Sequence, residues 1–97
     1  MIRYILVKRD ESANEFEVQM EWHWFIFKRR LNKNKFIIEN KSAIIMNIDH
    51  LCYGYFIINK YGDYIPVGIL YVNGIRELRC VSNHSNYIDN ILALPLM

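Results

Sequence analysis

The amino-acid sequence predicts an α+β protein that forms one small domain, residues 1–97, with a mainly antiparallel sheet and one or two helices. The first observation is a predicted hairpin over 55–72, in which two apolar, β-branched and aromatic runs flank a polar turn. The second is a set of shorter apolar runs of strand length on both sides of it. The third is the composition, 53% hydrophobic and 23% charged residues, which is typical of a globular domain. The hairpin is therefore expected at the centre of the fold.

The turn of this hairpin is expected over 59–63, between the runs Tyr55–Ile58 and Val67–Val72. Gly62 can adopt a positive φ without steric cost, which is what a tight turn needs. Pro66 lacks a backbone N–H donor, so it suits the entrance of a strand or the edge of a sheet better than an interior position.

Two further strands are predicted with little ambiguity. Residues Ile2–Lys8 contain the contiguous apolar run Tyr4–Val7, which indicates a first strand buried on both faces. The polar segment Arg9–Asn14 is expected to end it. The dipeptide Asn73-Gly74 is a strong turn signal, and Ile75–Val81 after it reads as a strand beside the hairpin.

The segment Glu15–Leu31 fits two periods. Phe16, Val18, Met20, Trp22 and Trp24 alternate with polar residues, which indicates a strand. The same segment has apolar residues at helical spacing, a capping box from Ser12 and Glu15, and a basic last turn, which indicate a helix. The pattern by itself slightly favours the strand.

Three shorter segments complete the outline. Phe36–Ile38 is short and apolar, and Ser42–Ile48 is either a helix capped by Ser42 or a strand. Tyr87–Leu94 is predicted to form a C-terminal helix, with Ser85 or Asn86 as its cap and Pro95 beyond its end.

The charges are segregated along the chain, although the net charge is only +2. Between Asp10 and Glu21 there are five acids and no base, and between Lys28 and Lys41 there are six bases and one acid. The net charge is too small to argue for nucleic acid, but the basic region is expected to attract anions.

Compartment and cofactor signals are few. The sequence shows no signal peptide and no apolar stretch approaching about 18 residues, so a cytoplasmic protein without membrane contact is expected. Cys52 and Cys80 are interpreted as buried thiols and not as a disulfide scaffold. His50 and His84 would complete a zinc-type ligand set with them, but the paired spacing is missing. We expect no metal, no cofactor and no catalytic residue.

Several short matches together resemble a known family. They are Met1-Ile2-Arg3, Met20, Phe27-Lys28-Arg29-Arg30-Leu31, Asp49, Val67-Gly68 and Glu77-Leu78-Arg79. In this order and spacing the chain resembles the first half of the GNAT acyltransferase superfamily, and within it the acyl-homoserine-lactone synthases. The resemblance implies a helix over Phe16–Leu31, an acyl thioester substrate and acidic carrier proteins as partners.

The chain departs from that family at four positions used for substrate handling. His23, Lys33, Met46 and Tyr71 stand where the family has arginine, tryptophan, aspartate and arginine. The Gly-rich loop that holds the pyrophosphate of coenzyme A in GNAT enzymes is also absent from the sequence. Glu77 is the one matched acid of interest for a shortened acyltransferase-like enzyme.

The leading functional hypothesis is a small non-catalytic binding protein, an inhibitor or adaptor, that engages another macromolecule through an aromatic and basic surface. The predicted partner-binding residues are Trp22, Trp24, Lys28, Arg29, Arg30, Lys33 and Lys35. A protein partner, including a second copy of the chain, is the first expectation. The alternatives are the acyltransferase-like enzyme and a binder of single-stranded nucleic acid, in which aromatic rings stack on bases beside phosphate-binding cations.

Overall fold

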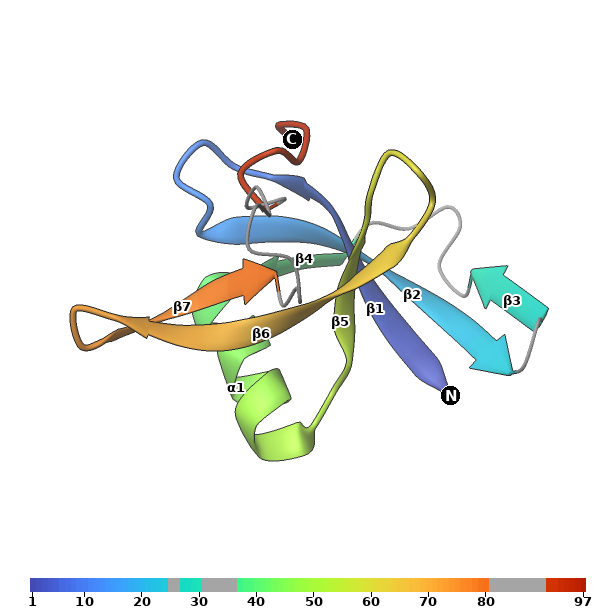
Figure 1. Ribbon diagram of the computed structural model, residues 1–97, viewed down its shortest axis with the longest axis horizontal. Coiled ribbons are helices and arrows are strands. Elements are labelled where there is room, and N and C mark those ends of the chain that lie inside the picture. Colours follow the sequence, from blue (N-terminus) through green and yellow to red (C-terminus); the bar gives the residue numbers. More distant parts are fainter. Residues whose placement is uncertain (25–26, 31–36, 81–90) are drawn as a thin grey trace.

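A computed structural model describes residues 1–24, 27–30, 37–80 and 91–97. Within these residues the chain forms seven strands and one helix, which confirms the α+β class (Figure 1). The elements are β1 (Ile2–Arg9), β2 (Glu15–Trp24), β3 (Phe27–Arg30), β4 (Ile37–Asn40), α1 (Lys41–Leu51), β5 (Tyr55–Ile58), β6 (Tyr64–Val72) and β7 (Ile75–Cys80). The strand order is β3-β2-β1-β5-β6-β7, with β4 also paired to β2. The predicted hairpin, β5 and β6, therefore lies in the interior of the sheet.

Strand β2 resolves the ambiguity of the segment Glu15–Leu31. The period of two is confirmed, and the helix that the family resemblance implies there is wrong for the described residues. Phe16 and Val18 are fully buried, because β2 pairs with β1 on one side and with β3 and β4 on the other. Pairing on both edges satisfies the backbone groups that a helix would have satisfied internally.

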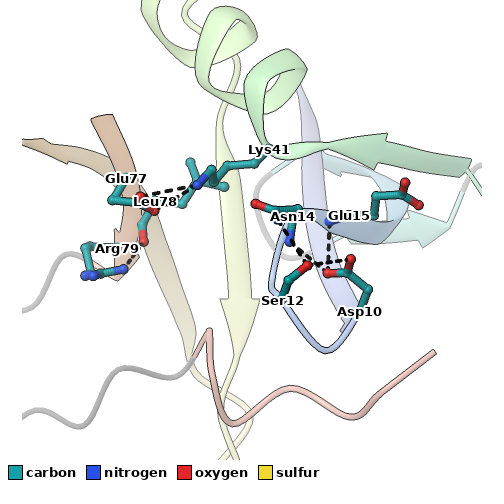
Figure 2. A network of polar contacts seen from close by, with 8 residues as sticks. All are labelled: Asp10, Ser12, Asn14, Glu15, Lys41, Glu77, Leu78 and Arg79. Atoms are coloured by element: carbon teal, nitrogen blue, oxygen red, sulfur yellow. Dashed lines mark hydrogen bonds and ion pairs between the residues drawn. The ribbon is translucent and has the colours of Figure 1, made fainter. Parts of the chain in front are cut away.

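The turn between β1 and β2 is organised by one aspartate (Figure 2). Asp10 Oδ1 accepts hydrogen bonds from the backbone N–H groups of Asn14 at 2.7 Å and Glu15 at 3.1 Å. The hydroxyl of Ser12 donates to the other carboxylate oxygen at 3.0 Å. The hydrogen bond from the Glu15 N–H, with those from Asn14 and Ser12, outweighs the desolvation of the carboxylate and lowers the pKa of Asp10.

Helix α1 forms where the sequence left helix and strand open. Its cap is Asn40, whose Oδ1 accepts a hydrogen bond from the N–H of Ala43 at 2.7 Å, and not Ser42 as predicted. The helix ends at Cys52, which has the left-handed φ of 55°. This position exposes Cys52, so the prediction of a buried thiol is wrong for it, whereas Cys80 is half-buried.

The turns of the hairpin region form as predicted. Gly62 has a φ of 83°, and Asn73 and Gly74 have φ values of 52° and 80°. Pro66 lies near the entrance of β6, at the point where this strand stops pairing with β5 and begins to pair with β7 at Val67. Its missing donor therefore falls at the change of partner strand.

The core lies between the sheet and α1. It is built from these buried side chains: Leu6, Phe16, Val18, Ile44, Ile45, Tyr55, Ile57, Val67, Leu78 and Ile91. An ion pair between Lys41 and Glu77, 3.1 Å apart, joins the first turn of α1 to β7 (Figure 2). The helix predicted over Tyr87–Leu94 falls largely outside the described residues, and 91–94 form a turn. In the described part of the chain, no helix has the length and apolar character to cross a membrane.

Candidate functional site

The helix leaves one end of its own sheet face uncovered. Trp22 and Trp24 follow Phe16 and Val18 at a spacing of two, so they lie on the face that packs against α1. However, α1 packs against β4, β6 and β7, and the carboxyl end of β2 extends away from it (Figure 1). Trp22 is accordingly 36% exposed and Trp24 is 56% exposed.

Two more side chains extend this exposed area, which we call the aromatic patch: Ile2, Trp22, Trp24 and Tyr53. Ile2 is the cross-strand partner of Trp22 and is 46% exposed. Tyr53, 40% exposed, stacks on Tyr4 with ring centroids 5.1 Å apart. Tyr4 lies two residues after Ile2 on the same face of β1, so the four residues share one end of the sheet.

The aromatic patch is anchored to the core through tyrosine contacts. Tyr4 also stacks on the buried Tyr55, with centroids 5.0 Å apart. The hydroxyl of Tyr55 donates to the carboxylate of Glu39 at 3.1 Å, and the amide of Asn47 donates to that hydroxyl at 3.0 Å. Burial raises the pKa of Tyr55 and of Tyr4, so both rings stay neutral across the physiological range.

Strand β3 places three consecutive basic residues directly beside β2. Lys28 is paired with His23, Arg29 with Trp22, and Arg30 with Glu21. Paired residues lie on the same face of the sheet, so Lys28 lies with His23 on the face opposite the tryptophans, where it is exposed. Arg29 holds the backbone position next to Trp22.

On that opposite face, a polar cluster holds the end of β2 in place. Glu21 forms an ion pair with Arg3 of β1 and accepts a hydrogen bond from the hydroxyl of Tyr64 of β6 at 2.8 Å. The guanidinium carbon of Arg3 lies 4.0 Å, and Lys28 Nζ 4.8 Å, from the centroid of the Tyr64 ring. We call these four residues the Glu21 cluster.

The Glu21 cluster shows that the sheet is strongly curled. Two other strands separate β2 from β6, so a flat sheet would place Glu21 and Tyr64 about 14 Å apart at the backbone. Lys28 is one strand farther away and still reaches the Tyr64 ring. The face that carries the cluster is therefore concave, and the aromatic patch lies on the outer face.

The charge state of Glu21 follows from competing effects. Burial favours its neutral form, but hydrogen bonds from Tyr64 and Arg3 and the charges of Arg3 and Lys28 outweigh this, so its pKa is lowered. Three buried polar atoms nearby have no hydrogen-bond partner within the part of the chain that the structure describes: Arg3 Nε, Gln19 Oε1 and His23 Nδ1.

The sequence predicted part of this arrangement. Trp22 and Trp24 are together and exposed, and Lys28, Arg29 and Arg30 lie in the adjacent strand; Lys33 and Lys35 fall outside the described residues. Sequence reasoning missed Tyr53 and the Glu21 cluster, because their contacts join segments that are distant in sequence. Among the described residues no group of three or more His, Cys, Asp or Glu side chains could hold a metal ion.

Comparisons of the chain with family models, with curated proteins and with solved structures found no match.

Proposed function

We propose that this protein is a non-catalytic binding protein that engages another macromolecule through the aromatic patch and the adjacent basic strand β3. The observation that carries the proposal is the exposure of Trp22 and Trp24 side by side on one face of β2. Ile2 and Tyr53 add two partly exposed apolar side chains at the same end of the sheet, and exposed apolar patches on soluble domains are often functional. Tryptophan is also the residue type most enriched at the energetic centres of interfaces.

Contacts within the chain hold Tyr53 of the patch and the strand that carries its two tryptophans. Tyr53 is stacked on Tyr4, which is itself stacked on the buried Tyr55. On the concave face, the Glu21 cluster ties the end of β2 to β1 and β6. Side chains that are already ordered lose less conformational entropy on binding, which favours a recognition surface at this end of the sheet.

Three acids among the described residues are engaged in structural contacts, which favours binding over catalysis. Glu21 is paired with Arg3, and Glu39 accepts the hydroxyl of Tyr55. Glu77, the acid that a shortened acyltransferase-like enzyme would use, forms its ion pair with Lys41. A general base needs a lone pair that can reach a substrate proton, and these contacts occupy the carboxylates.

The test compares two surface substitutions of similar kind. Trp24→Ser removes the most exposed ring of the patch, and Tyr61→Ser removes a ring that is 77% exposed in the turn between β5 and β6. Immobilised protein is incubated with a cell extract and the bound macromolecules are quantified. We expect Trp24→Ser to lose at least nine-tenths of what the unsubstituted protein retains specifically, and Tyr61→Ser to lose almost none. Equal retention by all three proteins would contradict the proposal.

A further inference from the structure

Strand β2 connects two separate surfaces of the protein. It has ten residues, so its two ends are roughly 30 Å apart. One end, at Trp24, carries the aromatic patch and is paired with β3. The other end, at Glu15, adjoins the turn 10–14 between β1 and β2, and Figure 1 shows this turn far from β3. The two ends are far enough apart to bind two different molecules at once.

The end of β2 that carries the patch has an excess of positive charge. Strand β3 places three consecutive bases beside it: Lys28, Arg29 and Arg30. Along the paired parts of β2 and β3 the single acid is Glu21, which is neutralised by Arg3. Charge acts over a Debye length of about 8 Å at physiological salt, so these bases attract acidic groups whichever face of the sheet their side chains occupy. We call the aromatic patch together with β3 the basic end.

The opposite end of β2 has an excess of negative charge. Three acids lie in or directly beside the turn: Asp10, Glu11 and Glu15. Arg9 is the base next to them. Two other bases near this turn face acids of their own. Lys8 is the cross-strand partner of Glu17, and Lys41 forms its ion pair with Glu77. The acids therefore outnumber the bases that could offset them.

Exposed apolar side chains accompany these acids. Residues 91–97 pack against the turn through Arg9, whose backbone N–H donates to the carbonyl of Pro95 at 3.0 Å and whose carbonyl accepts from the N–H of Met97 at 2.9 Å. The guanidinium of Arg9 also donates to the carbonyl of Leu92 at 2.8 Å. The side chains of Leu92, Leu96 and Met97 are about half exposed. We call these three residues with Asp10, Glu11 and Glu15 the acidic end.

We infer, on the basis of the proposed function, that the macromolecule is a second copy of this chain, whose acidic end docks on the basic end of the first. Each end combines exposed apolar side chains with charge, and the two charges are opposite in sign. Opposite charges orient two surfaces as they approach, and apolar contact then holds them together. A patch-to-patch dimer would bring two positive ends together, so it becomes an outcome of the test.

The inferred contact joins two different surfaces, which determines the kind of assembly. Each copy in a pair still has one unused end, so association continues to a ring or an open chain. Sedimentation equilibrium of the purified full chain, at concentrations up to about 500 μM, detects association with a Kd of about 1 mM or tighter. We expect species larger than a dimer. Raising the salt concentration from about 50 mM to 500 mM should weaken the association by about threefold or more, because it screens the opposite charges.

Substitutions at the two ends test whether these surfaces meet each other. Trp24→Asp removes a ring from the basic end and adds a charge that the acidic end repels. A double variant, Leu92→Ser with Leu96→Ser, removes two apolar side chains from the acidic end. Each variant alone should associate more weakly by about tenfold or more. Tyr61→Asp, which makes the same change as the first variant in the turn between β5 and β6, should associate like the unsubstituted protein.

An equal mixture of the two variants is the decisive sample. The double leucine variant retains an intact basic end, and Trp24→Asp retains an intact acidic end, so one native contact can form between them. We expect the mixture to form dimers and nothing larger, at a concentration where each variant alone is monomeric. Far-UV circular dichroism of each variant verifies the fold.

Three outcomes would overturn the inference: a chain that stays monomeric, association that Trp24→Asp leaves unchanged, or association that the double leucine substitution leaves unchanged. The last of these, with association lost in Trp24→Asp, would indicate a patch-to-patch dimer, and the proposed function would stand. The proposed function would also stand if the chain were monomeric while Trp24→Ser abolished retention from a cell extract, because the patch would then bind another macromolecule. If retention and self-association were both independent of Trp24, both proposals would fail.

Discussion

Replacing Tyr64 by phenylalanine removes a hydroxyl that donates to a buried carboxylate and leaves the ring in place. The hydroxyl lies 2.8 Å from Oε1 and 3.0 Å from Oε2 of Glu21, and its single proton forms one hydrogen bond shared between them. Glu21 is almost fully buried, so water cannot replace the lost donor. Hydrogen bonds to charged groups contribute about 1.5–3 kcal/mol, and we expect Tyr64→Phe to reduce the free energy of unfolding by about 2 kcal/mol.

The ring contacts explain why the effect is confined to the hydroxyl. The phenylalanine ring still lies under the guanidinium of Arg3 and beside Lys28, whose distances to the ring centroid are 4.0 and 4.8 Å. Packing and cation–π attraction are therefore nearly unchanged, and the carboxylate of Glu21 retains its pairing with Arg3. The substitution isolates the link between β2 and β6.

Urea denaturation at neutral pH, followed by far-UV circular dichroism, measures this loss. A change of about 2 kcal/mol corresponds to a melting temperature lower by roughly 8–16 °C for a domain of this size. The matched control, Tyr61→Phe, changes an exposed ring and should stay within about 0.5 kcal/mol of the unsubstituted protein. If Tyr64→Phe also stayed within that margin, the hydroxyl of Tyr64 would not bond a buried carboxylate and the curled sheet would be wrong at this point.

Three further perturbations test other parts of the fold. The pKa of Glu21 is lower in the folded state, so ionised Glu21 should contribute fully to stability above its unfolded pKa. This contribution should be lost as the pH falls through the folded pKa. The free energy of unfolding, measured from pH 7 to pH 2, should therefore fall less steeply for Glu21→Gln than for the unsubstituted protein. Asn40→Ala should lower the free energy of unfolding by about 1 kcal/mol and Ser42→Ala should not, because Asn40 caps α1. If Ser42→Ala unfolded at a lower urea concentration than Asn40→Ala, Ser42 would be the cap. Gly74→Ala should lower the free energy of unfolding by about 1–2 kcal/mol, because Gly74 has a φ of 80°. The space around it is open, so the loss comes from backbone strain alone. A variant that unfolds at the same urea concentration as the unsubstituted protein would contradict the turn geometry.

Local chemistry made much of the fold predictable from sequence. The alternation along β2 predicts a strand because one face of this strand packs into the core while the other faces the concave side. Gly62 and Asn73-Gly74 predict turns because their backbones adopt positive φ. These features depend on neighbours within a few residues, which a sequence displays directly.

Features that depend on long-range geometry were not predictable. Glu21 and Tyr64 are 43 residues apart in sequence, and they meet only because the sheet curls across two intervening strands. The patch was predicted through its tryptophans, but Tyr53 joins it only because it stacks on Tyr4 from another part of the chain. The cap of α1 was misplaced by two residues because both Asn40 and Ser42 are good caps and the strand β4 ends at the first of them.

A photo-crosslinking comparison tests whether the aromatic patch is a binding surface. A benzophenone-bearing phenylalanine is placed at position 24 in one protein and at position 61 in another, so that both probes stand at exposed ring positions. Both proteins are irradiated in a cell extract, with and without nuclease treatment. We predict a covalent adduct of discrete size from position 24 and not from position 61. Absence of an adduct from position 24, or equal adducts from both positions, would contradict the claim.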